Sequence, residues 1–204
     1  MLEEGAKQGM NLWIFILLGA AAALFLLKAA YVLAVAATVA NTRGALYVST
    51  PRRRIQALLD ALPLEKDQVV VDLGCGDGRT LRAARRRFSV RAVGYEINPL
   101  AYLKARLCCA LKGPKGLDIR YKNFWKAGGA LDEADAIFCY LFPDVMAVLA
   151  EKIKAEARPG ARVVSFNFPI PAFCPEQVLR PEGAGQNDPI YVYRVPESVI
   201  GAAS

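Results

Sequence analysis

A short apolar run that ends in a cluster of glycines, VVVDLGCGDG at residues 69–78, sets the framework for this 204-residue chain. The stretch that follows, 79–88, has the composition of a helix. Glycines between a buried strand and a helix allow a sharp turn and let the backbone approach a ligand closely. The segment therefore predicts an α/β domain whose ligand site lies beyond the end of its first strand.

Strand and helix patterns alternate through the rest of the chain. The predicted strands are 69–73, 91–96, 118–121, 135–140, 161–168, 176–179 and 189–195, and the predicted helices are 51–62, 79–88, 99–112 and 144–157. Near-continuous apolar strands separated by helices indicate a mostly parallel sheet covered on both faces. The last two strands are too close in sequence for a crossover helix. We therefore predict a Rossmann-like, doubly wound, mostly parallel seven-stranded sheet with an antiparallel last strand.

An apolar segment precedes this domain. Residues 12–27 carry no charge, and after Lys28 the apolar sequence continues to residue 40. As a helix, residues 11–40 are about 45 Å long, against roughly 30 Å for the hydrocarbon core of a bilayer. A transmembrane anchor is therefore predicted. A cleaved signal peptide fits less well, because the residues before the run are not basic and the run is long; a buried core helix is the other alternative.

The predicted organisation has four parts: a short tail (1–10), the anchor helix (11–40), the catalytic domain (41–198) and a loose tail (199–204).

Charges flanking the anchor predict its orientation. Two acids and one lysine (Glu3, Glu4 and Lys7) precede it, whereas Arg43 and the run Arg52–Arg54 follow it. Basic residues collect on the cytoplasmic side of membrane spans. We expect a single-pass membrane protein with its domain on that side. The arginines can also hold the domain against anionic lipid, or form a solvated helix face.

Composition removes several kinds of chemistry. The chain has no histidine, which excludes serine–histidine and cysteine–histidine nucleophilic pairs and histidine-ligated zinc. Its five cysteines show no CxxC spacing, so no metal centre is predicted and buried thiols in a reducing compartment are expected. Lysines and arginines exceed acids by 26 − 19, a net charge of +7.

The glycine cluster distinguishes between two kinds of cofactor. The dinucleotide pattern GxGxxG fails, because Arg79 stands at its third glycine. A pyrophosphate would also be repelled by Asp72 and Asp77, whereas S-adenosylmethionine carries a sulfonium and an ammonium but no phosphate. The alternative is a tight structural turn. The predicted cofactor-binding loop comprises Asp72, Gly74, Cys75 and Gly76.

Three later residues fit the same ligand. Glu96 ends the second predicted strand, where a carboxylate can accept hydrogen bonds from both ribose hydroxyls. After the third strand, the Asn123 amide can bond the adenine edge and Phe124 can form an apolar wall. The alternatives are an exposed strand-end acid for Glu96, and an Asx turn with core aromatics for the other two.

At this point the sequence resembles a known family. DLGCGDG, the acid in GYEINP and the strand ADAIFCY are similar to the class I, seven-strand S-adenosylmethionine-dependent methyltransferases. YVSTP before the first domain helix, KNFW and RVVSFNFPIP resemble, more narrowly, the small protein-lysine methyltransferases. These include an archaeal broad-specificity enzyme and membrane-anchored mitochondrial enzymes that act on the c-ring protein of ATP synthase and the adenine nucleotide translocase. The resemblance covers about residues 45–195.

The resemblance implies cofactor contacts at Asp72, Gly74, Gly76, Glu96 and Asn123. It also implies that Tyr47 and Thr50 close over the cofactor. Asn123 stands where the family often has aspartate, and Ser49 where proline is common.

The acceptor side of the site is predicted from residues at the carboxyl ends of later strands. Tyr140, Asn167 and Phe168 are the predicted catalytic residues, with Tyr140 or Asn167 orienting an amine through a hydrogen bond. Trp125 and Phe142 are further pocket walls, and ordinary core packing is the alternative for all the aromatics.

The predicted activity is methyl transfer to protein lysines at the membrane. A lipid or another small membrane-associated acceptor is an alternative. Nucleic acid is less favoured, because Cys139-Tyr140-Leu141-Phe142 replaces the Asn/Asp-Pro-Pro-Tyr/Phe signature typical of base methylation. A non-enzymatic cofactor-binding module is the least favoured interpretation.

Overall fold

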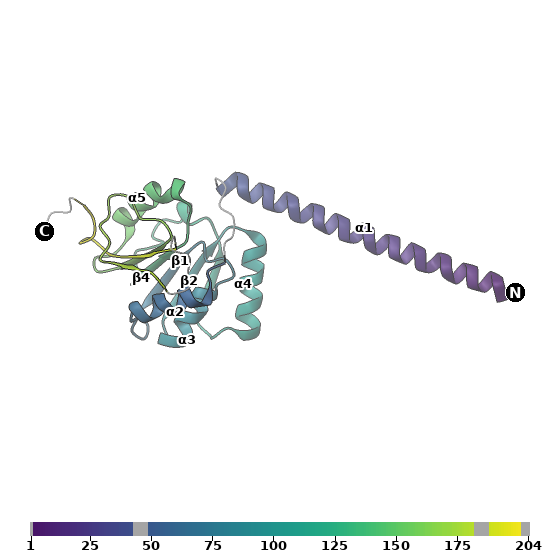
Figure 1. Cartoon of the computed structure of the whole chain (residues 1–204), viewed down its shortest axis with the longest axis horizontal. Coiled ribbons are helices and arrows are strands. Elements are labelled where there is room, and N and C mark those ends of the chain that lie inside the picture. Colours follow the sequence, from purple (N-terminus) through teal and green to yellow (C-terminus); the bar gives the residue numbers. More distant parts are fainter. Residues whose placement is uncertain (1, 43–48, 182–187, 201–204) are drawn as a thin grey trace. The chain divides into compact units, whose positions relative to one another are not determined.

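The computed structural model describes residues 2–42, 49–181 and 188–200. The chain divides into two compact units, Met1–Gly44 and Ala45–Ser204 (Figure 1). The first unit is one long helix, α1 (Leu2–Thr42). Within it, Trp13–Ala34 is long and apolar enough to cross a membrane, and none of it is buried against the protein. In the part of the chain that the structure describes, this is the one candidate span.

The second unit is built on a seven-stranded sheet. Its strands are β1 (Val69–Leu73), β2 (Arg91–Glu96), β3 (Leu117–Tyr121), β4 (Ala136–Cys139), β5 (Arg162–Phe166), β6 (Gln177–Leu179) and β7 (Ile190–Arg194). Their order in the sheet is β3-β2-β1-β4-β5-β7-β6. β7 is antiparallel to β5 and β6, and the other pairs are parallel. The predicted Rossmann-like sheet with an antiparallel last strand is confirmed.

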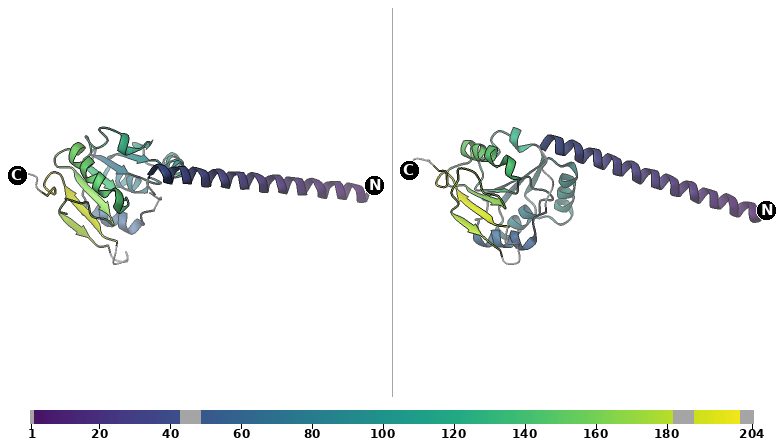
Figure 2. Two further views of the ribbon diagram at one scale, coloured as in Figure 1. Left: turned by 90° about the horizontal axis from the view of Figure 1, so that it is seen from above. Right: turned by 45° about the horizontal axis from the view of Figure 1, so that its top comes forward.

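Helices cover both faces of this sheet, as the apolar strands require. Helices α2 (Arg52–Ala61), α3 (Arg79–Phe88) and α4 (Pro99–Lys112) lie on one face, and α5 (Met146–Glu156) lies on the other. Because side chains alternate along a strand, Val70 packs with the first group while Val69 and Val71 pack with α5. Figure 1 shows α5 and α2 on opposite sides of the sheet, and Figure 2 gives the same layers from two further directions.

Some element boundaries differ from those predicted. The strand predicted for 161–168 ends at Phe166, because Asn167 has a φ of +69° that a strand cannot accommodate. The helix predicted for 144–157 starts with a 3₁₀ turn, Pro143–Val145, before α5. At the chain ends, α1 takes in residues 2–10, which contain no proline to break it. Val199 pairs with Phe173 and so extends the domain beyond 198.

Candidate active site

The loop after β1 depends on glycine at three positions. Gly74, Gly76 and Gly78 have φ values of +83°, +57° and +71°, which other residues rarely adopt. The N–H groups of Gly74 and Cys75 donate hydrogen bonds of 2.9 and 3.0 Å to the carbonyl oxygen of Tyr95 in β2. The loop is therefore held against the neighbouring strand, at the carboxyl edge of the sheet.

Cys75 turns its side chain into the protein. A Cβ added to Gly94 in β2 would lie 2.6 Å from the Cys75 sulfur and 2.8 Å from Leu81 Cδ1. Gly94 thus makes room for the thiol beneath the loop. Burial, with the nearby charges of Asp72 and Glu96, raises the pKa of Cys75 well above its ordinary value. The thiol is consequently a packing group, and the predicted contact of Cys75 with a cofactor falls to its backbone.

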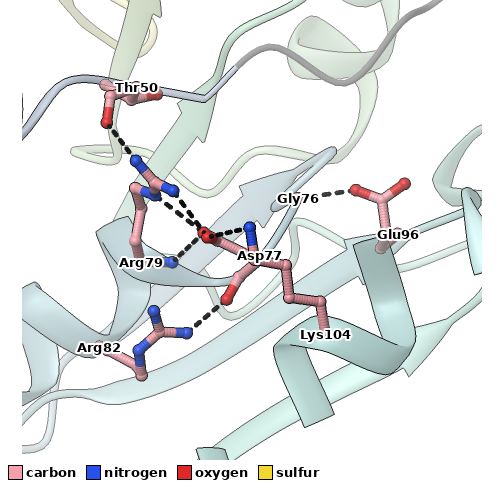
Figure 3. Close-up of polar contacts among 7 residues, drawn as sticks. All are labelled: Thr50, Gly76, Asp77, Arg79, Arg82, Glu96 and Lys104. Carbon is pink, nitrogen blue, oxygen red and sulfur yellow. Dashed lines mark hydrogen bonds and ion pairs between the residues drawn. The ribbon is translucent and has the colours of Figure 1, made fainter. Parts of the chain in front are cut away.

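Glu96 links the end of β2 to the glycine loop. Its Oε2 accepts a hydrogen bond of 2.7 Å from the Gly76 N–H, and its Oε1 accepts bonds of 2.8 and 2.7 Å from the N–H groups of Ile97 and Asn98. Figure 3 shows the bond to Gly76. Burial raises the pKa of Glu96, while these three donors oppose that rise. The carboxylate is therefore fixed in orientation at the strand end where a ribose is expected.

Asp72 is a second buried acid in this region. It is the fourth residue of β1 and is 7% exposed. Burial and the negative charge of Glu96 raise the pKa of Asp72 to about 8. Two acids without a cation between them are costly in a buried site. A positively charged ligand would lower that cost.

Asp77 does not provide a free carboxylate, contrary to the role inferred from the sequence. Arg79 holds it with bonds of 2.9 Å (Nε–Oδ1) and 2.8 Å (Nη2–Oδ2), and the Lys104 ammonium lies 3.4 Å from Oδ2. Burial alone would raise the pKa of Asp77, but Arg79 and Lys104 outweigh it and lower the pKa to about 2. The spacing in the sequence did not reveal that a cation two residues further on would neutralise this acid.

The same arginine reaches the segment before α2. Arg79 Nη1 donates a hydrogen bond of 3.3 Å to the carbonyl oxygen of Thr50 (Figure 3). Arg82 also donates to the carbonyl oxygen of Asp77. Ion pair and backbone contacts together join the glycine loop, the start of α3 and Thr50 into one unit. Tyr47, the other residue expected to close over a cofactor, lies outside the described residues.

A cleft of about 340 Å³ opens beside the glycine loop. Of the residues predicted for the site, those lining it are Thr50, Asp72, Gly74, Cys75, Gly76 and Tyr140. Phe166, at the end of β5, adds a wall that was not predicted. The cleft therefore brings the cofactor loop and one predicted acceptor-side residue to the same place.

Tyr140 and Asn167 form a pair, as expected for neighbours at the carboxyl ends of β4 and β5. The Asn167 Nδ2 donates a hydrogen bond of 3.0 Å to the Tyr140 hydroxyl, and its Oδ1 accepts one of 2.5 Å from Arg54 Nη2. The left-handed backbone at Asn167, which asparagine tolerates better than most residues, directs this amide.

Arg54 is the residue that the sequence analysis missed. It is 2% exposed, and its guanidinium carbon lies 5.5 Å from the ring centroid of Tyr140 and 5.2 Å from that of Phe166. Within the described residues, its Nε has no hydrogen-bond partner. The sequence predicts a lipid-facing or solvated face for the arginine run, which is wrong for Arg54 although Arg52 and Arg53 are exposed. Its position one turn before the buried Leu58 was the available signal.

The other predicted residues lie elsewhere. Phe168 packs with the core on the α5 side, and its carbonyl oxygen accepts a bond of 2.6 Å from Ser165 Oγ. Asn123 Oδ1 accepts a hydrogen bond of 3.0 Å from the Trp125 N–H, and Phe124 is buried against the Trp125 ring. Asn123 and Phe124 are absent from the described lining of the cleft. Their cofactor contacts stay predictions.

The sheet order, with β7 between β5 and β6, and the glycine loop tied to an acid at the end of β2 define a Rossmann-like methyltransferase domain. The family model described as the ANTKMT methyltransferase domain matches residues 72–177. The chain belongs to this family, which confirms the resemblance seen in the sequence.

Characterised relatives agree. A protein-lysine N-methyltransferase from Saccharolobus islandicus is 34% identical over 74% of this chain and 94% of its own length. The mouse adenine nucleotide translocase lysine N-methyltransferase is 35% identical over 73% of this chain, which spans 62% of that enzyme. A Xenopus laevis lysine N-methyltransferase named for the c-ring protein of ATP synthase is 30% identical over 65% of this chain and 58% of its own length.

Among solved structures, an RNA methyltransferase from Salinibacter ruber in complex with S-adenosyl-L-homocysteine has a TM-score of 0.68 and 28% identity. The match covers 77% of this chain and 99% of that one.

Proposed function

We propose that this chain transfers a methyl group from S-adenosylmethionine to the side-chain amine of protein lysines. The observation that carries the proposal is the cleft in which the glycine loop and the Tyr140–Asn167 pair meet. Methyl transfer needs donor and acceptor held in line about 3–3.5 Å apart with water excluded, and needs no histidine or covalent intermediate. A chain without histidine is compatible with this chemistry.

The residues around the loop fit S-adenosylmethionine, which supplies an electrophilic methyl group on a sulfonium when bound. The open backbone at Gly74 and Gly76 allows close approach. Glu96 is held in one orientation by three N–H donors and suits ribose hydroxyls. Asp72, with a pKa of about 8, ionises more readily beside a cation than alone. The acids thus suit a cationic, phosphate-free ligand.

The acceptor side favours a neutral amine. Roughly one lysine in a few thousand is neutral in water at pH 7, so a lysine methyltransferase must lower the pKa of its acceptor. The aromatic wall of Tyr140 and Phe166 excludes water from the approaching ammonium, and the guanidinium of Arg54 behind it repels positive charge. The Tyr140 hydroxyl and the Asn167 amide then orient the amine.

An in-vitro transfer assay tests this proposal. The full chain is incubated with membranes and S-adenosylmethionine carrying a labelled methyl group, and the label is followed into protein, lipid and RNA. Label in protein that amino-acid analysis recovers as methyl-lysine is the expected result. Label in the lipid extract alone, or no label above that of a Tyr140→Ala, Asn167→Ala double variant, would refute it.

RNA is the second candidate acceptor. The similarity to the Salinibacter ruber RNA methyltransferase, which this chain matches over almost that protein's full length, favours it. The RNA fraction of the same assay distinguishes the two, since nuclease treatment removes the label only if RNA is the acceptor.

We further propose that Trp13–Ala34 spans a membrane once and that the domain lies on the cytoplasmic side. The exposed Arg52 and Arg53 after the helix support this orientation. The acceptor would then be a membrane protein, as the names of the translocase and ATP synthase enzymes suggest for those relatives. Carbonate extraction should leave the chain in the membrane pellet, and release into the supernatant would exclude a span. In sealed vesicles, protease should reach the domain from the cytoplasmic side.

A further inference from the structure

Helix α4 exposes a row of leucines to solvent. Leu100, Leu103, Leu107 and Leu111 are 40%, 62%, 56% and 71% exposed. An α-helix turns by about 100° per residue, so these four side chains fall within roughly 80° of one another. The buried Ala101 and Ala105 face the sheet on the opposite side of the helix. The leucines therefore point away from the domain's own core. We call these four residues the leucine row.

Such a row is unusual on the surface of a folded domain. Single exposed leucines need no explanation, but a contiguous apolar stripe marks a surface that binds something. α4 covers β2 and β3 at one end of the sheet, and no described element packs over its outer side (Figures 1 and 2).

Charges beside the row indicate the partner. Lys104 and Arg106 flank it on its two sides, both are exposed, and the sequence of α4 contains no aspartate or glutamate. Leucines bordered by basic residues are the pattern of helices that lie in the interface of an anionic bilayer. A second copy of the chain fits poorly, because an antiparallel α4 pair would bring these like charges together.

The covalent structure keeps a bilayer within reach. Only six residues, 43–48, separate the end of α1 from Ser49. Fully extended they bridge at most about 25 Å. A domain of this size has a radius of gyration of about 15 Å, so a membrane that holds α1 lies close to the domain surface.

We propose that the leucine row of α4 is a bilayer-binding surface, which inserts its leucines among the lipid chains while Lys104 and Arg106 meet anionic headgroups. This inference rests on the proposed membrane span. α4 begins three residues after Glu96, at the carboxyl edge of the sheet. Seating the helix in the interface would thus bring that edge, and the candidate site with it, toward the membrane surface where a membrane-protein acceptor lies.

Photocrosslinking in the full chain tests the proposal. The photoreactive p-benzoylphenylalanine replaces Leu107 in one variant and, as the matched control, Val148 in another; Val148 is 51% exposed on α5, on the other face of the sheet. Each variant is reconstituted into phosphatidylcholine vesicles containing anionic phosphatidylglycerol, washed with carbonate and illuminated. Lipid adducts several-fold more abundant at 107 than at 148 are expected. Adding Arg106→Glu should reduce the adducts at 107 in anionic vesicles but not in purely zwitterionic ones.

The other outcomes are distinguishable. A chain that pellets with the vesicles but gives equal or no lipid adducts at the two positions overturns the role of α4 and leaves the span intact. Adducts at 107 to a second copy or to another protein likewise overturn it. A chain that stays in the supernatant overturns the span and the surface together. Methyl transfer is measured separately and depends on neither.

Discussion

The carboxylate of Glu96 and the backbone N–H of Gly76 are joined by a hydrogen bond of 2.7 Å that connects the end of β2 to the loop after β1. One acid thus has two tasks, since it orders the glycine loop and faces the place where a ribose is expected. Loss of either task should weaken cofactor binding.

Replacing Glu96 separates the two tasks. Glu96→Ala should weaken S-adenosylmethionine binding roughly tenfold or more, because hydrogen bonds to a charged group contribute about 1.5–3 kcal/mol. Glu96→Gln keeps an acceptor for one group of N–H donors but places an NH₂ opposite the other, so it should also loosen the loop. Calorimetry measures the affinity and thermal unfolding the loop's contribution; an unchanged affinity for Glu96→Ala would exclude the ribose role.

Asp72 should make cofactor binding depend on pH. Its pKa of about 8 means that the carboxyl is mostly protonated at pH 7 in the free protein, and a bound cation favours the ionised form. Binding should therefore release a proton at pH 7, and the affinity should rise as the pH increases toward 8. Calorimetry in two buffers of different ionisation enthalpy counts the proton. Asp72→Asn should abolish the release; a pH-independent affinity of the unmodified chain would contradict the argument.

Asp77 should make the fold sensitive to acid. Its pKa is lowered to about 2 in the folded chain from an ordinary 3.8, so its ion pairs stabilise the fold above pH 4 and are lost as the pH falls toward 2. The contribution is on the order of 2 kcal/mol. Urea unfolding across this range should show Asp77→Asn less stable at pH 6 and less affected by acid. Asp60→Asn, which breaks an exposed ion pair with Arg87, is the control and should change little.

Arg54 should set the pH at which the acceptor reacts. Arg54→Met removes the buried charge beside Tyr140 and Phe166, so the acceptor amine should stay protonated to a higher pH and the pH–rate profile should move up by roughly one unit. Arg54→Lys keeps the charge and should keep most of the profile. A purely structural role would lower the rate at every pH without moving the profile.

Gly94 should be intolerant of even one methyl group. The added Cβ of Gly94→Ala meets the Cys75 sulfur at 2.6 Å, and overpacking of this kind costs about 1–3 kcal/mol. Cys75→Ala removes the sulfur and should recover part of the stability in the double variant. If the two substitutions add without coupling, the proposed packing of the thiol beneath the loop is incorrect. Denaturant unfolding of the four proteins completes the cycle.

Much of the fold follows from local pattern. The apolar strands, the glycines after Leu73 and the short link before β7 are sufficient to predict the sheet and its antiparallel member, because burial and turn geometry are written in neighbouring residues. Glu96 was predicted for the same reason, since strand ends mark the ligand edge.

Polar partners were harder to predict. Arg54 is stabilised by Asn167, 113 residues further along the chain, and by carbonyl groups at 188 and 189. Only the folded sheet brings these acceptors together, so the arginine run looked like a surface. Asp77 was misjudged similarly: its charge was visible, but the direction of the Arg79 side chain was not.

The position of β7 has a consequence for biosynthesis. The last strand to leave the ribosome fills a gap between two earlier ones, so β5 keeps an open edge and β6 has no neighbour until residue 194 has emerged. The N-terminal helix is made first and reaches a membrane while the sheet is still incomplete. Truncation anywhere before β7 should therefore leave an aggregation-prone remnant rather than a smaller working enzyme.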